Sequence, residues 1–387
     1  MKKELSMLLS LAFLIMLCAC GASKQVEPNN AAENSTSGEI VADDKATKYI
    51  EAEEYETQND YADAAIAFGK IIGYSDANDR SIDNWEKTNK YNTIAVSSNH
   101  TVAVKNDGTV VATGSNAQGQ CDLSDWSDII AVAAGPGITV GLKSDHTVIS
   151  SKKDIDVAGW KNIVDIAVSS QSVIGVSADG TIVHTPLYDG GDELLNDDFL
   201  NGRLVDVISV DADARSTTLI ALTSKGSVVC DSSQDQYGQC RVGLWSGRII
   251  SVDAGTCVTA GVMSTGHVEI AGLEGSQAKA SATIVKNSVE TWRDIIDVAA
   301  GYDHIICLKS DGTTDAVSLS EIASEAEKFK NFSKGESKVQ NWSNIVDVVA
   351  CDRISVGLRS DGTVVAAGDN SEGACDVGTW TDIRLPM

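Results

Sequence analysis

The sequence predicts an all-β protein, a seven-bladed β-propeller, with a short α-helical hairpin in front of it. Three observations lead to this prediction. One pattern of residues is written seven times between Ile94 and Ile383, each copy is centred on a tight turn, and the apolar residues around the turn alternate with a period of two. This alternation is typical of short antiparallel strands, and the length of the repeat is typical of a propeller blade.

The tight turns recur every 34 to 50 residues. They are flanked by β-branched runs such as Thr101–Val104 and Thr109–Ala112. Asp-Gly between two such runs predicts a hairpin with a type I′ turn, in which both central residues have positive φ. The seven turns are Asp107-Gly108, Asp145-His146, Asp179-Gly180, Lys225-Gly226, Thr265-Gly266, Asp311-Gly312 and Asp361-Gly362.

Two further positions recur in the repeat. The strand before each turn carries Val, Ile or Leu on one face and a small residue at one fixed place on the other, which favours sheets that pack closely face to face. A tryptophan follows most turns, and we interpret its ring as packing between neighbouring sheets rather than stacking on a ligand. The small residues are Ala103, Gly141, Gly175, Ala221, Gly261, Cys307 and Gly357. The tryptophans are Trp126, Trp160, Trp245, Trp292, Trp342 and Trp380, and Leu200 replaces the tryptophan in one copy.

The ends of the repeat region predict a closed ring. A sheet of about four strands with two apolar faces is not stable alone, whereas seven sheets placed radially bury those faces and leave only short edges. The segment Trp380–Ile383 reads as the start of a blade whose remaining strands begin at Ile94. We therefore expect the two ends of the region to meet in one shared sheet.

The repeat resembles that of the regulator of chromosome condensation (RCC1) family, which consists of seven-bladed β-propellers. The resemblance covers about three-quarters of the chain, residues 92–387. Copies three, four and five depart from the pattern, because the Asn-x-x-Gly-Gln turn is missing from copies three and five and Lys225 replaces the usual Asp in copy four. Copy one carries Ser97, His100-Thr101-Val102, Asp107-Gly108-Thr109-Val110, Gly114, Asn116 and Gly119-Gln120, and copy seven carries Gly357-Leu358, Asp361-Gly362-Thr363-Val364, Gly368, Asn370 and Gly373.

The beginning of the chain predicts export and a lipid anchor. Lysines at positions 2 and 3 precede the apolar run Leu8–Leu17, which is too short to span a bilayer and is typical of a signal peptide, residues 1–19. The run ends Leu17-Cys18-Ala19-Cys20-Gly21, which resembles a bacterial lipobox with Cys20 as the diacylated residue. We expect the mature chain to be anchored to the outer face of the bacterial cell membrane through Cys20. The alternative is an ordinary signal peptide with incidental cysteines.

The sequence predicts a flexible tether at residues 20–45 and a helical segment at residues 46–91. The first stretch is rich in Asn, Ser, Ala and Glu, which is typical of a solvated linker. In the second, a helix is predicted to start after Asn59-Asp60 and to carry one apolar face. The run Asn59–Phe68 resembles half of a tetratricopeptide repeat, which leaves two interpretations: a helical hairpin packed on the propeller, or an independent partner-binding module. The apolar face consists of Tyr61, Ala64, Ala65, Phe68, Ile71 and Ile72.

The composition excludes some partners. The net charge is −25, with a pI near 4.4, so the phosphate backbone of a nucleic acid would be repelled. Chromatin binding, the role of the nuclear member of the family, is therefore disfavoured. Export disfavours the nucleotide exchange that this member performs on a small GTPase. We expect a monomer that binds no nucleic acid.

Seven cysteines remain besides Cys20 in the predicted mature chain. Three of them, Cys121, Cys240 and Cys375, occupy the same place in three repeats, and equivalent places on different blades should lie too far apart to form a disulfide. We therefore expect free, structural thiols. The seven are Cys121, Cys230, Cys240, Cys257, Cys307, Cys351 and Cys375.

The sequence offers no catalytic, metal or cofactor motif. The histidines are scattered, and His100 and His304 share the repeat position at which the family's histidine makes a structural hydrogen bond. The acidic clusters lack the glycine-punctuated loop of a calcium motif and are interpreted as solvated surface. A glycan-acting enzyme or sensor with acidic residues near the propeller axis remains the alternative, because the ring could bring distant carboxylates together. The clusters are Asp122/Asp125/Asp128, Asp197/Asp198 and Asp211/Asp213.

The loops of one face are the predicted binding site. Connections in a propeller alternate between two faces, so the loops before the second strand and the Asn-x-x-Gly-Gln turns should share a face opposite the hairpins. Loop residues that differ from copy to copy, within a repeat that is otherwise constant, can determine binding specificity. Tyr302 and Arg353 have the chemistry of interface hot spots. A secreted β-lactamase inhibitory propeller resembles this chain in gripping a protein with such loops. The partner-binding candidates are Asn99, Gln171, Asp213, Arg215, Tyr302, Asp303, Asp352 and Arg353.

The expected function is that of a non-catalytic extracellular module that binds a protein or a cell-envelope component. Three insertions interrupt the repeats, at residues 186–201, 272–291 and 317–340, and the last predicts a helix on the rim of blade six. The sequence leaves open the identity of the partner, the face that binds it, and the roles of the helical segment and the insertions.

Overall fold

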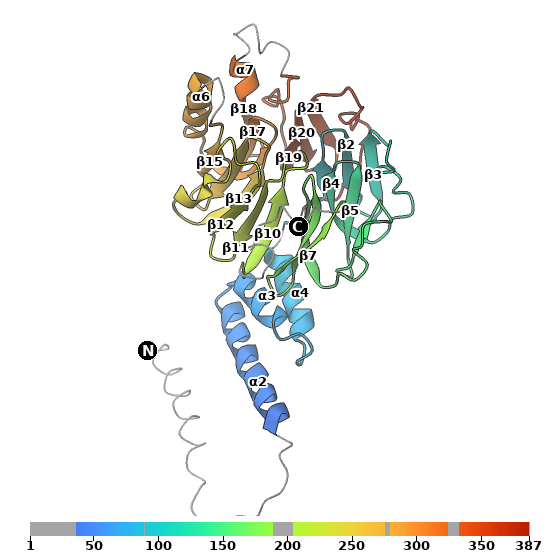
Figure 1. The fold of residues 1–387 in the computed structure, drawn as a ribbon, viewed down its shortest axis with the longest axis vertical. Coiled ribbons are helices and arrows are strands. Elements are labelled where there is room, and N and C mark those ends of the chain that lie inside the picture. The colour runs from blue at the N-terminus through green and yellow to red at the C-terminus, as the bar shows by residue number, and fades with distance from the viewer. Residues whose placement is uncertain (1–35, 89, 189–203, 275–278, 324–332, 387) are drawn as a thin grey trace, which may run out of the picture. The chain divides into compact units, whose positions relative to one another are not determined.

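The computed structural model describes residues 36–88, 90–188, 204–274, 279–323 and 333–386 (Figure 1). The chain divides into two units, Met1–Asp44 and Lys45–Met387. The second unit contains all the sheets. The predictions for the signal peptide, for Cys20 and for Leu200 lie outside the described residues.

Within the described residues the chain forms seven antiparallel sheets of three strands each, in sequence order. This confirms the seven-bladed β-propeller, and blade one is β1–β3, blade two β4–β6, and so on to blade seven. The strands are β1 Ile94–Val96, β2 His100–Val104, β3 Val110–Gly114, β4 Ile129–Gly135, β5 Ile138–Lys143, β6 Val148–Ser150, β7 Ile163–Val168, β8 Ser172–Ser177, β9 Ile182–Pro186, β10 Val207–Ala212, β11 Leu219–Thr223, β12 Val228–Asp231, β13 Ile249–Ala254, β14 Val258–Met263, β15 Val268–Gly272, β16 Ile295–Ala300, β17 His304–Lys309, β18 Thr314–Ser318, β19 Ile345–Cys351, β20 Ile354–Arg359 and β21 Val364–Gly368.

The prediction of about four strands in each sheet is wrong. The segment after the third strand forms turns instead, as in residues 115–128 of blade one. There the Asn116 side chain accepts a hydrogen bond from the Cys121 N–H at 2.9 Å and donates one to Asp122 Oδ1 at 2.8 Å. These side-chain bonds bind the backbone locally, so it is not available for a fourth ladder.

The prediction of type I′ turns between the second and third strands is also wrong. In blade one Gly108 has φ 79°, whereas Asp107 is not among the residues with positive φ. Lys105 O accepts from Gly108 N at 3.0 Å and Lys105 N donates to Thr109 O at 2.8 Å, which is a three-residue loop ending in a glycine bulge. The Asp107 side chain favours this form because its Oδ1 accepts from both Thr109 N and Thr109 Oγ1, at 2.9 and 2.6 Å.

The recurring tryptophans pack in the core between blades, as predicted, and several of them contact the recurring small residue of the next blade. A Cβ atom added to Gly141 would lie 2.7 Å from the Trp126 ring, and one added to Gly357 would lie 2.8 Å from the Trp342 ring. Gly175 and Gly261 meet Trp160 and Trp245 in the same way. The small residue therefore makes room for the indole, and the two sequence signals describe one contact.

The ring closes through the two ends of the repeat region, which confirms that prediction. Ile383 forms an antiparallel bridge with Lys105, and Arg384 N donates to Val104 O at 2.9 Å. Ile383 N also donates to Gly362 O at 3.1 Å, as Ile129 N does to Gly108 O at 3.0 Å between blades one and two. The C-terminal segment thus supplies the start of the first strand of blade one, whose remainder is β1.

In the described part of the chain three helices precede the propeller: α2 (Thr36–Thr57), α3 (Tyr61–Gly69) and α4 (Ala77–Thr88). The predicted tether is wrong for its last ten residues, because α2 already begins at Thr36; the strong helix formers of α2, such as those of Glu51–Glu54, lie further along the chain. The predicted helix start after Asp60 is confirmed, and Ala64, Ala65 and Phe68 are fully buried. Trp85 is also fully buried, and its Nε1 donates to Ala178 O of the propeller at 2.9 Å. The helices pack beside the sheets of blades three and four (Figure 1).

Two insertions carry helices. The insertion at 272–291 contains α6 (Lys279–Val289), and the one at 317–340 begins with α7 (Leu319–Ala323), so the predicted rim helix is confirmed for the part of it that is described. A short 3₁₀ helix, η2 (Arg241–Leu244), follows β12. None of the described helices combines the length and the apolar character that crossing a membrane requires.

One disulfide bond, Cys230–Cys240, corrects the prediction of free thiols. The prediction compared only equivalent places on different blades. Cys230 lies on β12 and Cys240 in the turn that follows it on the same blade, with a Cα–Cα distance of 5.1 Å, within the range of disulfides. The cysteines found as free thiols are Cys121, Cys257, Cys307, Cys351 and Cys375.

Candidate functional site

The predicted loop residues converge on one cluster, named here the arginine–tyrosine cluster: Arg215, Tyr302, Asp352 and Arg353. Arg215 Nη1 lies 2.6 Å from Asp352 Oδ2. The guanidinium carbons of Arg215 and Arg353 lie 5.9 and 5.8 Å from the centre of the Tyr302 ring, within cation–π range. The residues come from blades four, six and seven, so the fold brings together positions far apart in sequence.

The remaining candidates have different surroundings. Asp213 is 2% exposed and accepts from Thr256 Oγ1 at 2.8 Å, and Asp303 is 7% exposed and accepts from Ser320 Oγ. Burial raises the pKa of both carboxyl groups, that of Asp303 to about 6. These two residues hold their loops and do not offer a contact surface. Asn99 and Gln171 belong to the equivalent loops of blades one and three and bond within those loops: Asn99 Oδ1 accepts from Ser97 Oγ and Gln171 N donates to Ser169 Oγ, each at 3.1 Å.

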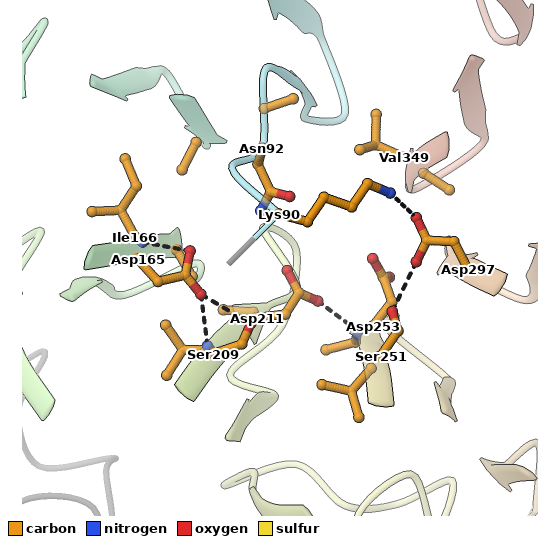
Figure 2. Close-up of a pocket in the computed structure, with 18 of the residues that line it drawn as sticks. Lys90, Asn92, Asp165, Ile166, Ser209, Asp211, Ser251, Asp253, Asp297 and Val349 are labelled. Atoms are coloured by element: carbon orange, nitrogen blue, oxygen red, sulfur yellow. Dashed lines mark hydrogen bonds and ion pairs between the residues drawn. The ribbon is translucent and has the colours of Figure 1, made fainter. Parts of the chain in front are cut away.

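The second candidate site is a cavity of about 250 Å³ on the propeller axis, lined mainly by the first strands of the blades (Figure 2). The alternative function expected acidic residues near the axis without naming any of them, and Asp211 and Asp213 are not the solvated surface that the sequence suggested. The sequence signal was present: Ser209 with Asp211, and Ser251 with Asp253, alternate along two first strands and so point to one side. The charged residues among those that line the cavity are Lys90, Asp165, Asp211, Asp213, Asp253, Asp297 and Asp347.

Three of these carboxylates join neighbouring blades. Asp165 Oδ2 accepts from Val210 N at 3.0 Å, Asp211 Oδ2 from Ala254 N at 2.6 Å, and Asp253 Oδ1 from Ala300 N at 2.8 Å. In each case the donor lies on the first strand of the next blade. The inner edge of a blade has unpaired N–H groups, and these side chains satisfy some of them.

Burial raises the pKa values of the same three carboxyl groups. The pKa of Asp165 is raised to about 7 and that of Asp211 to about 6, while burial and the neighbouring Asp211 raise the pKa of Asp253 well above its usual range. The hydrogen bonds that they accept oppose this rise without cancelling it. The centre of the ring is therefore partly protonated near neutral pH.

Lys90 supplies a cation to this acidic interior. Its Nζ contacts Asp297 Oδ2 and lies 2.7 Å from Asp347 Oδ1. Burial within the ring would lower the pKa of the lysine, but the two carboxylates outweigh it and the pKa is raised. The side chain keeps 38% exposure, toward the water-accessible cavity. Figure 2 shows it reaching across the cavity toward Asp297.

The axial carboxylates do not support the alternative expectation of a glycan-acting enzyme. Three of them are engaged in joining blades, and Asp297 and Asp347 are engaged by Lys90. Within the part of the chain that the structure describes, there is no group of three or more His, Cys, Asp or Glu side chains arranged to hold a metal ion.

A comparison with known protein families supports the predicted resemblance for part of the chain. Residues 92–120 match the family model described as the regulator of chromosome condensation (RCC1) repeat. Blade one thus resembles an RCC1 repeat. No curated protein matches the sequence.

Solved structures agree with this fold. The CRINKLY WD40 ectodomain of the Arabidopsis thaliana receptor kinase ACR4 superposes with a TM-score of 0.50 at 15% identity, over 76% of this chain and 99% of that one. The ectodomain of the Physcomitrella patens receptor kinase CR4 gives a TM-score of 0.49 at 14% identity, over 72% and 73% of the two chains. Prp20p from Saccharomyces cerevisiae gives 0.40 at 13% identity, over 76% of each chain. At these identities the likeness concerns the fold alone.

The repeat histidines are structural, as predicted. His100 Nε2 lies 2.9 Å from Thr139 Oγ1 of blade two, and His304 Nε2 lies 2.9 Å from Ser355 Oγ of blade seven. Burial lowers the pKa of both to about 4. Both rings are therefore neutral at physiological pH and tie one blade to the next.

Proposed function

We propose that this RCC1-like propeller is an exported, monomeric, lipid-anchored interaction module that binds a protein or cell-envelope partner through its loop face without catalysis. The observation that carries the proposal is the arginine–tyrosine cluster. Two guanidinium groups flank one tyrosine ring at the loop face, and they come from blades that are distant in sequence.

The chemistry of the cluster supports binding. Arginine and tyrosine dominate the energetics of protein interfaces, because each offers a large apolar surface together with fixed hydrogen-bonding groups. The Arg215 side chain is 44% exposed, and the Tyr302 ring and Arg353 are partly exposed. Two guanidinium groups lie close together here in a protein of net charge −25, and one of them is already paired with Asp352. A partner that presents a carboxylate or an aromatic group would fit it.

The binding half of the proposal is tested with two double variants. Tyr302→Ala/Arg353→Ala should reduce capture of binding partners from cell-envelope extracts at least about tenfold, the loss expected for one or two hot-spot side chains. Tyr55→Ala/Arg293→Ala removes the same two residue types from exposed positions outside the loop face and should leave capture unchanged. Equal capture by both variants, with melting temperatures near that of the unmodified protein, would show that the loop face is the wrong surface.

The anchoring half of the proposal rests on the lipobox-like run that ends at Cys20. Cells that express the chain should incorporate a labelled fatty acid into it. Cys20→Ser should abolish the label and release the protein, whereas Cys18→Ser, two residues away, should keep both label and attachment. Label that is retained in Cys20→Ser would overturn the anchor without affecting the binding proposal.

A further inference from the structure

The axial cavity extends along the first strands from the loop face toward the hairpin face. At the loop face Asp213 and Ala214 line it, and Ala214 is buried in a cluster with Ile94 and Cys351 of blades one and seven. The Arg215–Asp352 ion pair holds this loop across the ring. At the other end of the first strands the lining includes Ile250 and Ile296, which are 48% and 50% exposed. A ligand would therefore enter past an apolar rim.

The interior has more negative than positive groups. Among the described residues that line the cavity, six are aspartates and one, Lys90, is a cation. Asp347 is 2% exposed, and its Oδ2 is buried without a hydrogen-bond partner among the described residues, although Oδ1 binds Lys90. A buried carboxylate oxygen without a partner is costly, so a donor that reached it would be stabilised.

Lys90 shows which donor this interior accepts. Its ammonium group lies between two carboxylates, at the end of a four-carbon apolar stem that crosses the cavity, whose apolar lining is mostly Val, Ala and Ile. The side chain is thus a tethered aliphatic amine inside the ring. Asp211 and Asp253, on neighbouring first strands, accept from backbone N–H groups, and within the described residues no ion pair joins either of them to a cation.

We propose that the axial cavity is a binding site for a small aliphatic diamine, with one ammonium group at the Asp211–Asp253 pair and the other at the carboxylate of Asp347, whose buried Oδ2 turns toward the ligand. The site is independent of the partner-binding face. The ligand's methylene chain lies against the small apolar side chains, and its ammonium groups contact carboxylates as Lys90 Nζ contacts those of Asp297 and Asp347, without displacing Lys90.

The size and chemistry of the cavity select this class of ligand. Cavities for drug-sized molecules measure about 300 to 1,000 Å³, so a cavity of about 250 Å³ suits a smaller molecule. A metal ion needs several oxygen ligands that converge on one point, and the described residues offer no such group. A diamine needs separate carboxylates with apolar surface between them, which is the arrangement present.

Binding should release protons. The groups that face the site are Lys90, Asp165, Asp213, Asp297 and Asp347 around Asp211 and Asp253, with Arg215 beside Asp213. An ammonium group prefers ionised carboxylates. The pKa values of Asp211 and Asp253 are raised by burial and by neighbouring carboxyl groups. Affinity should therefore rise with pH, by up to about tenfold per pH unit for each proton released.

The direct test is calorimetric titration of the full chain with cadaverine at about pH 6 and about pH 8, at physiological ionic strength. We expect saturable binding that is tighter at the higher pH, with proton release. Asp253→Asn, which keeps an acceptor for Ala300 N, should weaken binding at least about tenfold. Asp125→Asn, an exposed aspartate elsewhere with the same charge change, should bind as the unmodified protein does.

A second test uses Lys90 itself. Lys90→Met removes the internal ammonium and should lower the melting temperature at about pH 8, where the carboxylates it leaves behind are charged. Cadaverine should restore several degrees, more than sodium chloride of equal ionic strength. Lys153→Met, at an exposed position, should show neither the loss nor the rescue.

Three outcomes overturn the proposal. The first is no saturable binding of cadaverine. The second is equal affinity in Asp253→Asn, which places the ligand elsewhere. The third is that sodium or calcium chloride restores the melting temperature of Lys90→Met as much as cadaverine does. This would mean that the interior needs only charge screening or a metal ion. None of these outcomes bears on capture by the loop face.

Discussion

At the residue scale, one recurring close contact of the repeat is a glycine beneath a tryptophan. In blade two a Cβ atom on Gly141 would approach the Trp126 ring to 2.7 Å and Ile129 Cδ1 to 3.2 Å. Blades one, four and six have Ala103, Ala221 and Cys307 at this place. The contact explains why small residues and tryptophans recur together.

We predict that Gly141→Ala destabilises the protein by about 1 to 3 kcal/mol, the usual cost of overpacking a rigid core. The φ of Gly141 is not positive, so the cost comes from the indole and not from backbone strain. Gly159→Ala is the matched control, because nothing lies within 4 Å of an added Cβ there. Urea unfolding of both variants measures the difference, and equal midpoints would contradict the packing argument.

The axial carboxylates predict a dependence of stability on pH. The folded-state pKa values of Asp165, Asp211 and Asp253 are raised above those of the unfolded chain, mainly by burial. A raised carboxyl pKa contributes stability below the unfolded pKa, and this contribution is lost as pH rises through the folded pKa. Hairpin carboxylates such as Asp107, whose pKa is lowered by bonds from Thr109, titrate below this window.

We therefore expect the melting temperature to rise as pH falls from about 7.5 to about 5.5. Asp253→Asn should melt higher than the unmodified protein at the upper pH and should show a smaller rise on acidification, because one of the three groups no longer titrates. Asp125→Asn should follow the unmodified curve. A melting temperature that falls on acidification over this range would refute the sign.

Sequence reasoning at this scale found the arginine–tyrosine cluster but not the burial around it. Arg215, Tyr302 and Arg353 were predicted from the loop positions alone, since variable positions in a fixed frame point to one face. Asp213 could not be recognised as buried, because its environment comes from Thr256 and Cys351 of other blades. Burial of this kind depends on contacts that no local pattern records.

At the element scale, the departure of copy four from the repeat has a physical cause. Lys225 stands where the hairpins usually have Asp, and its Nζ contacts Asp63 Oδ2 on α3. Asp63 also accepts from Ser224 Oγ at 2.6 Å and is 9% exposed. Lys70 of the helical region pairs with Asp206 at 2.7 Å. The hairpin of blade four was thus adapted to hold the helices.

Restoring the usual residue should loosen that contact. Lys225→Asp places a second carboxylate against Asp63, and we expect a loss of about 1 to 2 kcal/mol, below the cost of a fully buried pair because the lysine end is exposed. Thr265→Asp restores the same residue type in blade five and should be neutral or slightly stabilising. Asp63→Lys combined with Lys225→Asp should recover part of the loss in urea unfolding. No recovery in this double variant would indicate that the pair does not hold the helices.

Element boundaries were predictable where alternation was strong and not where side chains bind the backbone locally. The strands on either side of the hairpins were found from their alternating residues. The expected fourth strand is absent from the described blades because Asn116 and its equivalent Asn370 bind the turn that follows the third strand. The disulfide was missed because only distances between blades had been considered.

At the scale of the whole molecule, each blade is joined to the next by one repeated bond. The first residue of a blade's first strand donates its N–H to the hairpin of the preceding blade, as Ile345 does to Gly312 at 2.9 Å. The bond from Ile383 to Gly362 is the last of this series, so the ring is complete only when the C-terminal segment is in place. The expectation from Trp380–Ile383 succeeded because closure reuses the pattern of every other junction.

Two truncations test this closure. A chain that ends at Gly378 loses Trp380 and the fully buried Ile383, together with the bonds of Ile383 and Arg384 to blade one. Each buried side chain of this size contributes about 1.5 to 3 kcal/mol, and the gap also exposes facing sides of blades one and seven. We expect a loss of at least about 4 kcal/mol or failure to fold cooperatively.

A chain that ends at Arg384 is the control. It lacks only the last three residues, which include the partly exposed Leu385, and should unfold at the midpoint of the unmodified protein. If the shorter chain unfolds at the same urea concentration as the longer one, the ring does not depend on the junction between its ends, and the stability of the propeller must reside within the separate blades.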